Sequence, residues 1–338
     1  MSLLHILDHW PLALLTARAA DLFEILPGPT LIHLPGRRPE PLFVSILLHG
    51  NEDVGLRAVQ RLLEQAPSQS LPRALSIFVG NVSAARHNVR RLDGQPDYNR
   101  VWPGSDGDGT SEHAMMREVV TEMKARRVFA SVDLHNNTGI NPHYGCVSRL
   151  EHAHLQLASL FSRTVVYFRV PHGVQTRAFS DLCPAVTCEC GKVGDPRGVS
   201  RAAEFLGTCL HLAEVPVHRI APGDVHLFHT VATVTIPPGT SFSFSSSQAA
   251  LQFPHDLESL NFQELETGAL LARRRAGTVA KLIARDETGA DVSGELLEFS
   301  PEAIRLRRPV MPSMLTCNEQ VIQQDCLCYF MERFPLPA

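Results

Sequence analysis

Short apolar runs alternate with amphipathic segments through the first two-thirds of the chain. The runs are six or seven residues long and rich in aliphatic side chains, which is typical of buried strands. The predicted strands span residues 42–48, 74–79, 128–134, 164–170 and 184–189. Segments with helical periodicity lie between and after them, at residues 54–63, 111–127, 151–163 and 195–214. This alternation predicts an α/β fold with a mostly parallel (mixed) sheet flanked by helices.

The pattern changes near Pro216. The remaining sequence is rich in turns and in alternating β-branched residues, as in residues 231–236 and 241–244, which favours short strands. We therefore predict two domains in the 338 residues: residues 1–220 form the α/β domain, and residues 221–338 form a smaller β-rich C-terminal domain.

The first 26 residues predict an amphipathic helix rather than a signal peptide. Apolar side chains recur at Leu3, Leu4, Leu7, Leu14 and Leu15, and no basic segment precedes them. No apolar run in the chain approaches the roughly 18 residues of a membrane span. We therefore expect a cytoplasmic protein without a membrane partner.

The charge and the cysteine content further narrow the class of protein that the sequence can encode. The formal net charge is −4 and the sequence pI is about 6.5, and no basic stripe is present, so the sequence argues against a nucleic-acid partner. None of the eight cysteines forms a C-x-x-C pair. In a cytoplasmic chain they are expected to be reduced and mostly buried thiols.

Polar side chains with metal-binding chemistry follow two of the predicted strands. His49 and Glu52 come directly after the strand at 42–48, and His135 comes directly after the strand at 128–134. The carboxyl ends of parallel strands meet at one edge of a sheet, where ligands bind. Two imidazoles and one carboxylate are the protein ligands of a catalytic zinc site. The alternative is two unrelated histidines at strand ends.

Two further groups have the chemistry of substrate binding and proton transfer. Asn99 and Arg100 lie between the metal-binding segments and offer a planar set of donors to a carboxylate. Glu189 ends the strand at 184–189 before a glycine turn, where burial would raise its pKa and suit a general base. The alternatives are a surface salt bridge for Arg100 and a pairing of Glu189 with Lys192 or Arg197.

Together these segments resemble the succinylglutamate desuccinylase/aspartoacylase branch of the zinc carboxypeptidase superfamily. The resemblance covers roughly residues 40–200 and implies a zinc-carboxypeptidase-like fold. Four segments carry it, in the family's order: His49-x-x-Glu52, Asp97-x-Asn99-Arg100, Asp133-Leu134-His135 and Thr187-x-Glu189-x-Gly191-Lys192.

The resemblance implies a role for each matched position. His49, Glu52 and His135 match the ligands of one Zn²⁺ per chain, and Glu189 matches the catalytic general base.

The resemblance also implies how substrate is bound. Asn99 and Arg100 match the pair that binds the substrate's carboxylate. Arg91 resembles the arginine that polarises the scissile carbonyl, with Arg90 as the alternative.

Two departures from the family pattern bear on the substrate. The segment from Arg91 to Asp97 is one residue longer than usual. The segment at 136–145 is nearer to aspartoacylases at its start than at its end. An arginine for a second substrate carboxylate is not clearly placed; Arg177 is a candidate by its proximity to the Glu189 strand.

The sequence thus predicts a zinc-dependent amide hydrolase that removes an acyl group from a small-molecule N-acyl amino acid. A carboxypeptidase-like metallopeptidase acting on a peptide C-terminus is the alternative, because Asn99 and Arg100 would bind a terminal carboxylate in both. A metal- or ligand-binding module without catalysis is a third hypothesis, and the presence of Glu189 argues against it.

Overall fold

The computed structural model describes residues 3–65 and 70–337, and the chain forms two compact units. The first unit comprises Met1–Asn136, His143–Leu227 and Pro335–Ala338. The second comprises Asn137–Pro142 and Phe228–Phe334. Residues 137–142 therefore belong to the second unit, although the residues before and after them in the sequence belong to the first. The domain division at residue 220 stays a prediction.

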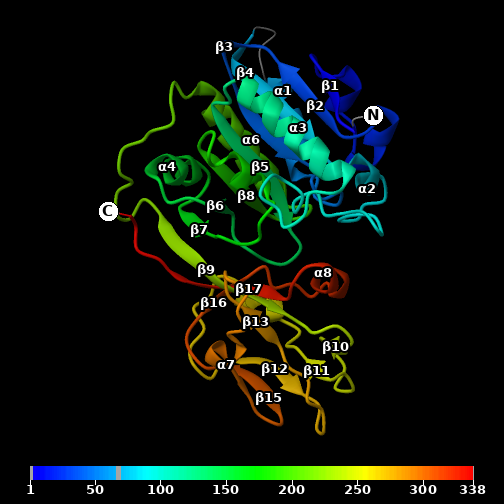
Figure 1. Ribbon diagram of the computed structural model, residues 1–338, viewed down its shortest axis with the longest axis vertical. Helices are drawn as coiled ribbons and strands as arrows, with labels where there is room; N and C mark the ends of the chain where they lie inside the picture. The colour runs from blue at the N-terminus through cyan, green and yellow to red at the C-terminus, as the bar shows by residue number, and fades with distance from the viewer. Residues whose placement is uncertain (1–2, 66–69, 338) are drawn as a thin grey trace. The chain divides into compact units, whose positions relative to one another are not determined.

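A mixed sheet forms the centre of the first unit (Figure 1). Its strands lie in the order β1-β2-β4-β3-β5-β8-β6-β7. Their bounds are β1 His5–Leu7, β2 Thr30–Leu34, β3 Gly36–Ile46, β4 Leu71–Val79, β5 Ala130–Asn137, β6 Tyr144–Val147, β7 Thr164–Tyr167 and β8 Ala185–Lys192. The pairs β3/β4 and β3/β5 are parallel, whereas β2/β4 and β6/β8 are antiparallel.

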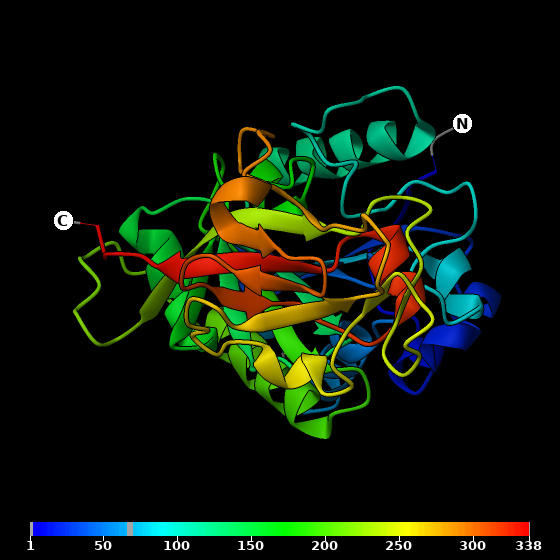
Figure 2. The same cartoon turned by 90° about the horizontal axis from the view of Figure 1, so that it is seen from below.

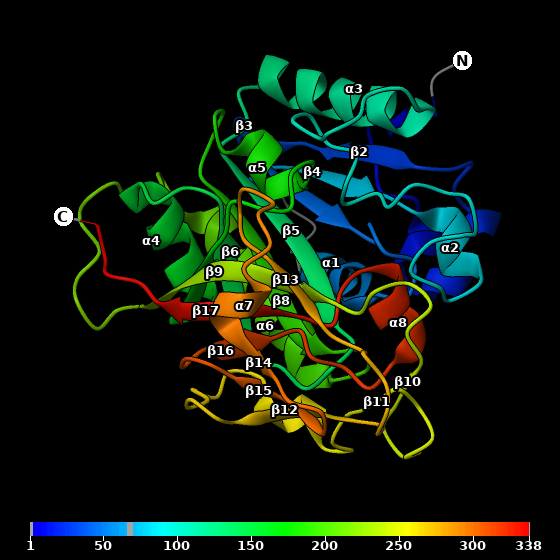
Figure 3. The same cartoon turned by 60° about the horizontal axis from the view of Figure 1, so that its bottom comes forward.

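Helices cover both faces of this sheet (Figure 3). The helices of the unit are α1 Val54–Gln65, α2 Val82–Arg86, α3 Ser111–Ala125, α4 His152–Phe161, α5 Gln175–Phe179 and α6 Pro196–His211. Helix α6 contacts α1, α4, β4 and β8 on one face. On the other face, methionines of α3 and Phe179 of α5 pack with Phe43 and Phe78 of the sheet. The layers explain why the central strands are buried on both sides.

The register of β3 and β5 sets the position of the candidate site. These strands run parallel, with Ser45 beside Asp133. His49, just after β3, and His135, near the end of β5, therefore lie at the same edge of the sheet. All eight residues of β5 are buried, so its polar side chains must find partners within the protein.

The predicted mixed sheet flanked by helices is confirmed, and two details differ. The strands β2 and β6 were missed by the sequence pattern. The predicted N-terminal amphipathic helix is wrong: β1 and two 3₁₀ helices, Leu12–Leu15 and Ala19–Glu24, occupy this segment. Parallel pairing of β1 with β2 and Pro11 at the start of the first 3₁₀ helix explain the difference.

The second unit is rich in strands, as predicted for the C-terminal region. Strand β17 pairs antiparallel with β9 and with β16, and Figure 2 shows the red β17 beside the yellow-green β9. A second sheet has the order β10-β11-β12-β15-β14. The bounds are β9 His226–Thr235, β10 Phe242–Ser243, β11 Leu251–Gln252, β12 Leu270–Arg274, β13 Ile283–Arg285, β14 Leu297–Phe299, β15 Ala303–Leu306, β16 Met311–Ser313, β17 Cys328–Arg333, α7 Ser293–Leu296, α8 Glu319–Gln324 and a 3₁₀ helix at Leu257–Leu260.

None of the helices in the described ranges has the length and apolar character that crossing a bilayer requires.

Candidate functional site

A tight turn after β3 presents His49 and Glu52. A Cβ atom at Gly50 would lie 2.3 Å from the Ala84 carbonyl carbon in α2, so only glycine fits this close approach. The Gly50 N–H donates to the Arg90 carbonyl at 3.1 Å. The turn is therefore held against α2 and against the segment that follows it.

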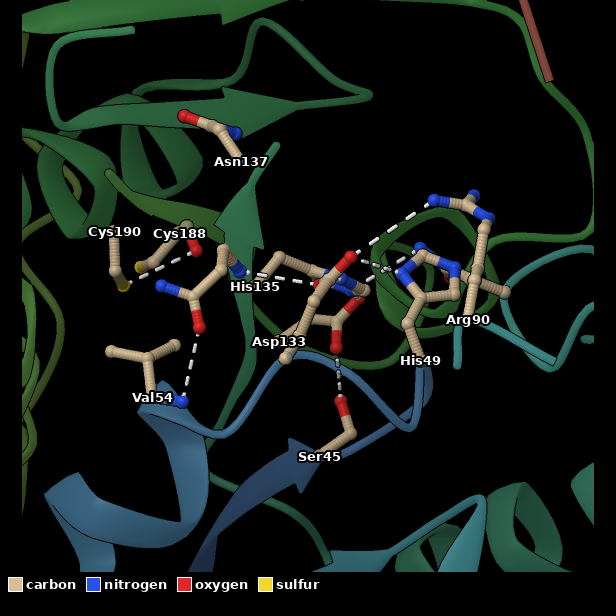
Figure 4. A network of polar contacts seen from close by, with 12 residues as sticks. Ser45, His49, Val54, Arg90, Asp133, His135, Asn137, Cys188 and Cys190 are labelled. Carbon is tan, nitrogen blue, oxygen red and sulfur yellow. Dashed lines mark hydrogen bonds and ion pairs between the residues drawn. The ribbon is translucent and has the colours of Figure 1, made fainter. Parts of the chain in front are cut away.

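Three side chains from two strand ends converge in this region (Figure 4). Nδ1 of His49 lies 2.8 Å from Oε1 of Glu52, and Nδ1 of His135 lies 2.8 Å from Oε2 of the same carboxylate. All three residues are buried. Among the residues that the structure describes, this is the group with metal-binding chemistry whose donor atoms lie within 4.8 Å of one another.

Each imidazole contacts a second carboxylate through its other nitrogen. Nε2 of His49 lies 3.1 Å from Asp97 Oδ1, and Nε2 of His135 lies 2.8 Å from Asp133 Oδ2. Ser45 in turn donates to Asp133 Oδ1 at 2.7 Å (Figure 4). Metal-binding histidines commonly have such carboxylate partners, which fix the ring orientation. These contacts leave Nδ1 of both rings directed at Glu52.

The sequence did not assign roles to Asp97 and Asp133. A signal for Asp133 exists: it lies two residues before His135, so both side chains are on one face of β5. Asp97 lies in a loop, and its distance from His49 in the sequence conceals their contact.

The triad fits a divalent metal ion by its chemistry. Two imidazole nitrogens and a carboxylate suit zinc, and bonds of about 2.0–2.2 Å are within reach of donor atoms so closely grouped. The outer carboxylates are partners of the kind that metal-binding histidines commonly have.

Arg90, and not Arg91, lies beside the triad. The Arg90 side chain is 10% exposed; its Nη2 donates to Asp97 Oδ2 at 2.9 Å, and its Nη1 is 4.0 Å from Glu52 Oε1. The Arg91 guanidinium donates to the Gln95 carbonyl at 2.9 Å. The structure thus brings together the triad and the alternative arginine of the sequence analysis.

Asn99 and Arg100 lie on the same loop as Asp97. The Asn99 side-chain amide is 3.3 Å from Nε2 of His135, and its Oδ1 accepts from the Gln175 N–H at 3.3 Å. Asn99 is buried, whereas Arg100 is partly exposed and donates to the Asn99 carbonyl at 2.8 Å. Asn99 therefore lies beside the triad, and Arg100 lies next to Asn99 at a position that is partly open to solvent.

Glu189 is a buried carboxylate near the end of β8, in register with Tyr144 of β6. Burial raises its pKa to about 7, although the positive charge of His135 acts in the opposite direction. Burial would also raise the pKa of Glu52, but the charges of His49 and His135 prevail and lower it. Two carboxylates with pKa values moved apart are typical of a site that uses one as ligand and one for proton transfer.

Comparison with known families identifies the family of this chain. The model of the succinylglutamate desuccinylase/aspartoacylase catalytic domain matches residues 42–212, just over half of the chain. The chain belongs to this family, which places it among hydrolases of the deacylase class. No curated protein matches the sequence.

Solved structures with the same fold include the following three enzymes. The succinylglutamate desuccinylase from Chromobacterium violaceum is 18% identical, with a TM-score of 0.56 over 90% of this chain and 87% of that chain. The succinylglutamatedesuccinylase/aspartoacylase from Rhodobacter sphaeroides is 15% identical, with a TM-score of 0.60 over 90% and 88%. Murine aminoacylase 3 is 15% identical, with a TM-score of 0.52 over 88% and 96%.

Proposed function

We propose that this chain is a zinc-dependent amide hydrolase that removes the acyl group from an N-acyl amino acid. The observation that carries the proposal is the convergence of the buried triad His49, Glu52 and His135 in the same unit as the buried carboxylate Glu189. Family membership and the names of the structural neighbours support a deacylase. These residues fall within residues 1–220, which we propose as the catalytic domain.

His49, Glu52 and His135 would hold the metal ion. A bound zinc ion lowers the pKa of a coordinated water to about 7 and polarises a carbonyl oxygen. Asp97 and Asp133 orient the two imidazoles.

The remaining residues bind substrate and move protons. Arg100 offers its guanidinium to the substrate carboxylate, and Asn99 supplies an amide donor beside it. Glu189 accepts a proton from the attacking water and returns it to the leaving amine nitrogen. Arg90 stabilises the negative charge that develops on the carbonyl oxygen.

A hydrolysis screen tests this proposal. The Zn²⁺-loaded protein is incubated with N-acetyl, N-succinyl and N-formyl amino acids and with short peptides, and the products are identified. We expect a free carboxylic acid and a free amino acid from one of the N-acyl series. Stepwise loss of C-terminal residues from peptides would instead support the metallopeptidase alternative.

We expect one divalent ion per chain after loading with Zn²⁺, and loss of that ion from His135→Ala. The physical reason is that two remaining ligands hold zinc far less well than three. Metal analysis of the dialysed proteins measures the stoichiometry. His226→Ala, which changes an exposed histidine, is the matched control and should keep the ion. An unchanged metal content in His135→Ala would contradict the assignment.

Arg100→Ala is expected to raise KM by about 10–100-fold, since a charge-assisted hydrogen bond contributes roughly 1.5–3 kcal/mol. The value of kcat should change little, because this contact is the same in the ground state and the transition state. Steady-state kinetics check both constants. A substrate analogue with its carboxylate converted to an amide provides the control, because it should be insensitive to the substitution. A fall in kcat without a rise in KM would remove Arg100 from carboxylate binding.

A further inference from the structure

Asn136 follows His135 on β5 and presents its side chain to the opposite face of the strand. It is 4% exposed, so its amide must be hydrogen-bonded within the protein. Both the oxygen and the nitrogen of the amide have hydrogen-bond partners. One partner lies two residues after Glu52, and the other lies two residues after Glu189.

The first partner is the start of helix α1. Oδ1 of Asn136 accepts from the Val54 N–H at 3.1 Å. The N–H groups of a first helical turn need partners outside the helix. Asn136, in strand β5, therefore caps the N-terminus of α1 as an N-cap side chain would. Val54 is two residues after Glu52. The backbone N–H of Asn136 also donates directly to Glu52 Oε2 at 3.2 Å.

Close packing of α1 makes this contact possible. A Cβ atom at Gly55 would lie 2.6 Å from Cγ2 of Ile46 in β3 and 3.2 Å from Cβ of Leu134 in β5. The glycine therefore lets the first turn of α1 approach the sheet near the end of β5. The first turn of α1, which follows Glu52, is thus held by the close packing of Gly55 and by the hydrogen bond from Val54 to Asn136.

The second partner is the end of β8. Nδ2 of Asn136 donates to the Gly191 carbonyl at 3.1 Å. Gly191 has a φ of +79°, so the chain turns here, two residues after Glu189. Gly198 in α6 packs so closely on Cys190 that a Cβ atom would lie 2.1 Å from the Cys190 carbonyl oxygen. The hydrogen bond from Asn136 and the packing of α6 thus both hold the end of β8, just after Glu189.

We propose that Asn136 is a positioning residue that sets the place of the general base Glu189 relative to the metal ligand Glu52. One planar amide connects the segment of each carboxylate, so a shift of either one breaks a hydrogen bond. The inference rests on the proposed function for the roles of the two carboxylates. It assigns Asn136 no contact with substrate, and Asn136 is not a catalytic residue.

Two substitutions separate the two hydrogen bonds. Asn136→Ala removes both, and we expect kcat of the Zn²⁺-saturated protein and its Zn²⁺ affinity to fall by about 10–100-fold each. Asn136→Asp keeps the acceptor for the Val54 N–H and loses the donor for the Gly191 carbonyl. We expect it to lower kcat by a similar factor while Zn²⁺ affinity stays within about threefold of wild type. KM should stay within about threefold in both variants, because Asn99 and Arg100 are unchanged.

The matched control is Thr110→Ala, which removes the side-chain cap of α3 in the same unit. Loss of a cap costs about 1 kcal/mol of stability in either place, but Asn136, unlike Thr110, connects the two carboxylate segments. Thermal unfolding measures this loss, and competition with a chromogenic chelator measures Zn²⁺ affinity. If the variants of Asn136 match Thr110→Ala in kcat and in Zn²⁺ affinity, Asn136 has a structural role only and the inference is overturned.

The measurements also separate this inference from the proposed function. Zn²⁺ affinity is measured without substrate, so Asn136→Ala tests the hydrogen bond to the Val54 N–H, two residues after Glu52, even if the wild type hydrolyses no N-acyl amino acid. If Asn136→Ala does not fold, kcat of Asn136→Asp decides: a value within about threefold of wild type overturns the inference.

Discussion

Replacing Glu189 with glutamine is expected to lower kcat of the Zn²⁺-loaded protein by about 10²–10⁴-fold, or roughly 3–5 kcal/mol of barrier. The amide keeps the shape of the carboxylate and cannot accept a proton from water. Metal content should be unchanged, because Glu189 is not a member of the triad. Turnover and bound Zn²⁺ are measured on the same preparation.

The matched control is Glu204→Gln, which neutralises an exposed carboxylate in α6 of the same unit. One alternative for Glu189, a pairing with Arg197, loses support because Arg197 Nη2 lies 2.9 Å from Asp195 Oδ2. If fully loaded Glu189→Gln turned over within a few-fold of wild type, Glu189 would leave the mechanism and the base would have to be sought elsewhere.

The carboxyl ends of β3 and β5 illustrate what the sequence could predict. An apolar run in the sequence precedes each histidine, at residues 42–48 and 128–134, and buried parallel strands bring such ends to one edge of a sheet. The meeting of these two histidines with Glu52 follows from that pattern. Hydrophobic periodicity thus predicted the fold class and grouped the candidate ligands.

Other parts of the site depend on contacts that no local pattern encodes. Strand β6 is four residues long and pairs antiparallel with β8, so its periodicity is too short to be recognised. Asp97 meets His49 across 48 positions of the chain. Asn136 is one of two consecutive asparagines, and only the fold shows that its amide joins α1 to β8.

The neighbouring arginines are a clearer case of this limit. Sequence similarity alone favoured Arg91 for the scissile carbonyl and kept Arg90 as the alternative. Adjacent residues in a loop point in different directions, and the direction is set by the partners available. Asp97 and Glu52 attract Arg90, whereas the Gln95 carbonyl accepts from Arg91.

We therefore expect Arg90→Ala to lower kcat by about 10²–10³-fold, the usual cost of removing one group that stabilises an oxyanion. Arg91→Ala is the matched control and should stay within about threefold of wild type, because its guanidinium contacts a loop carbonyl. Steady-state kinetics on the Zn²⁺-loaded variants measure both effects. Thermal unfolding is needed beside them, since Arg90→Ala also removes the guanidinium that pairs with the largely buried Asp97.

Arg90→Lys separates catalysis from this loss of stability. It keeps a positive charge near Asp97 but replaces the planar fork of the guanidinium with a single ammonium. We expect near-normal stability and a kcat between those of Arg90→Ala and the wild type. A large fall in kcat for Arg91→Ala, with Arg90→Lys unaffected, would return the role to Arg91. That result would also mean that the loop from Arg90 to Asp97 rearranges when substrate binds, because Arg91 would have to leave the Gln95 carbonyl to reach the scissile bond.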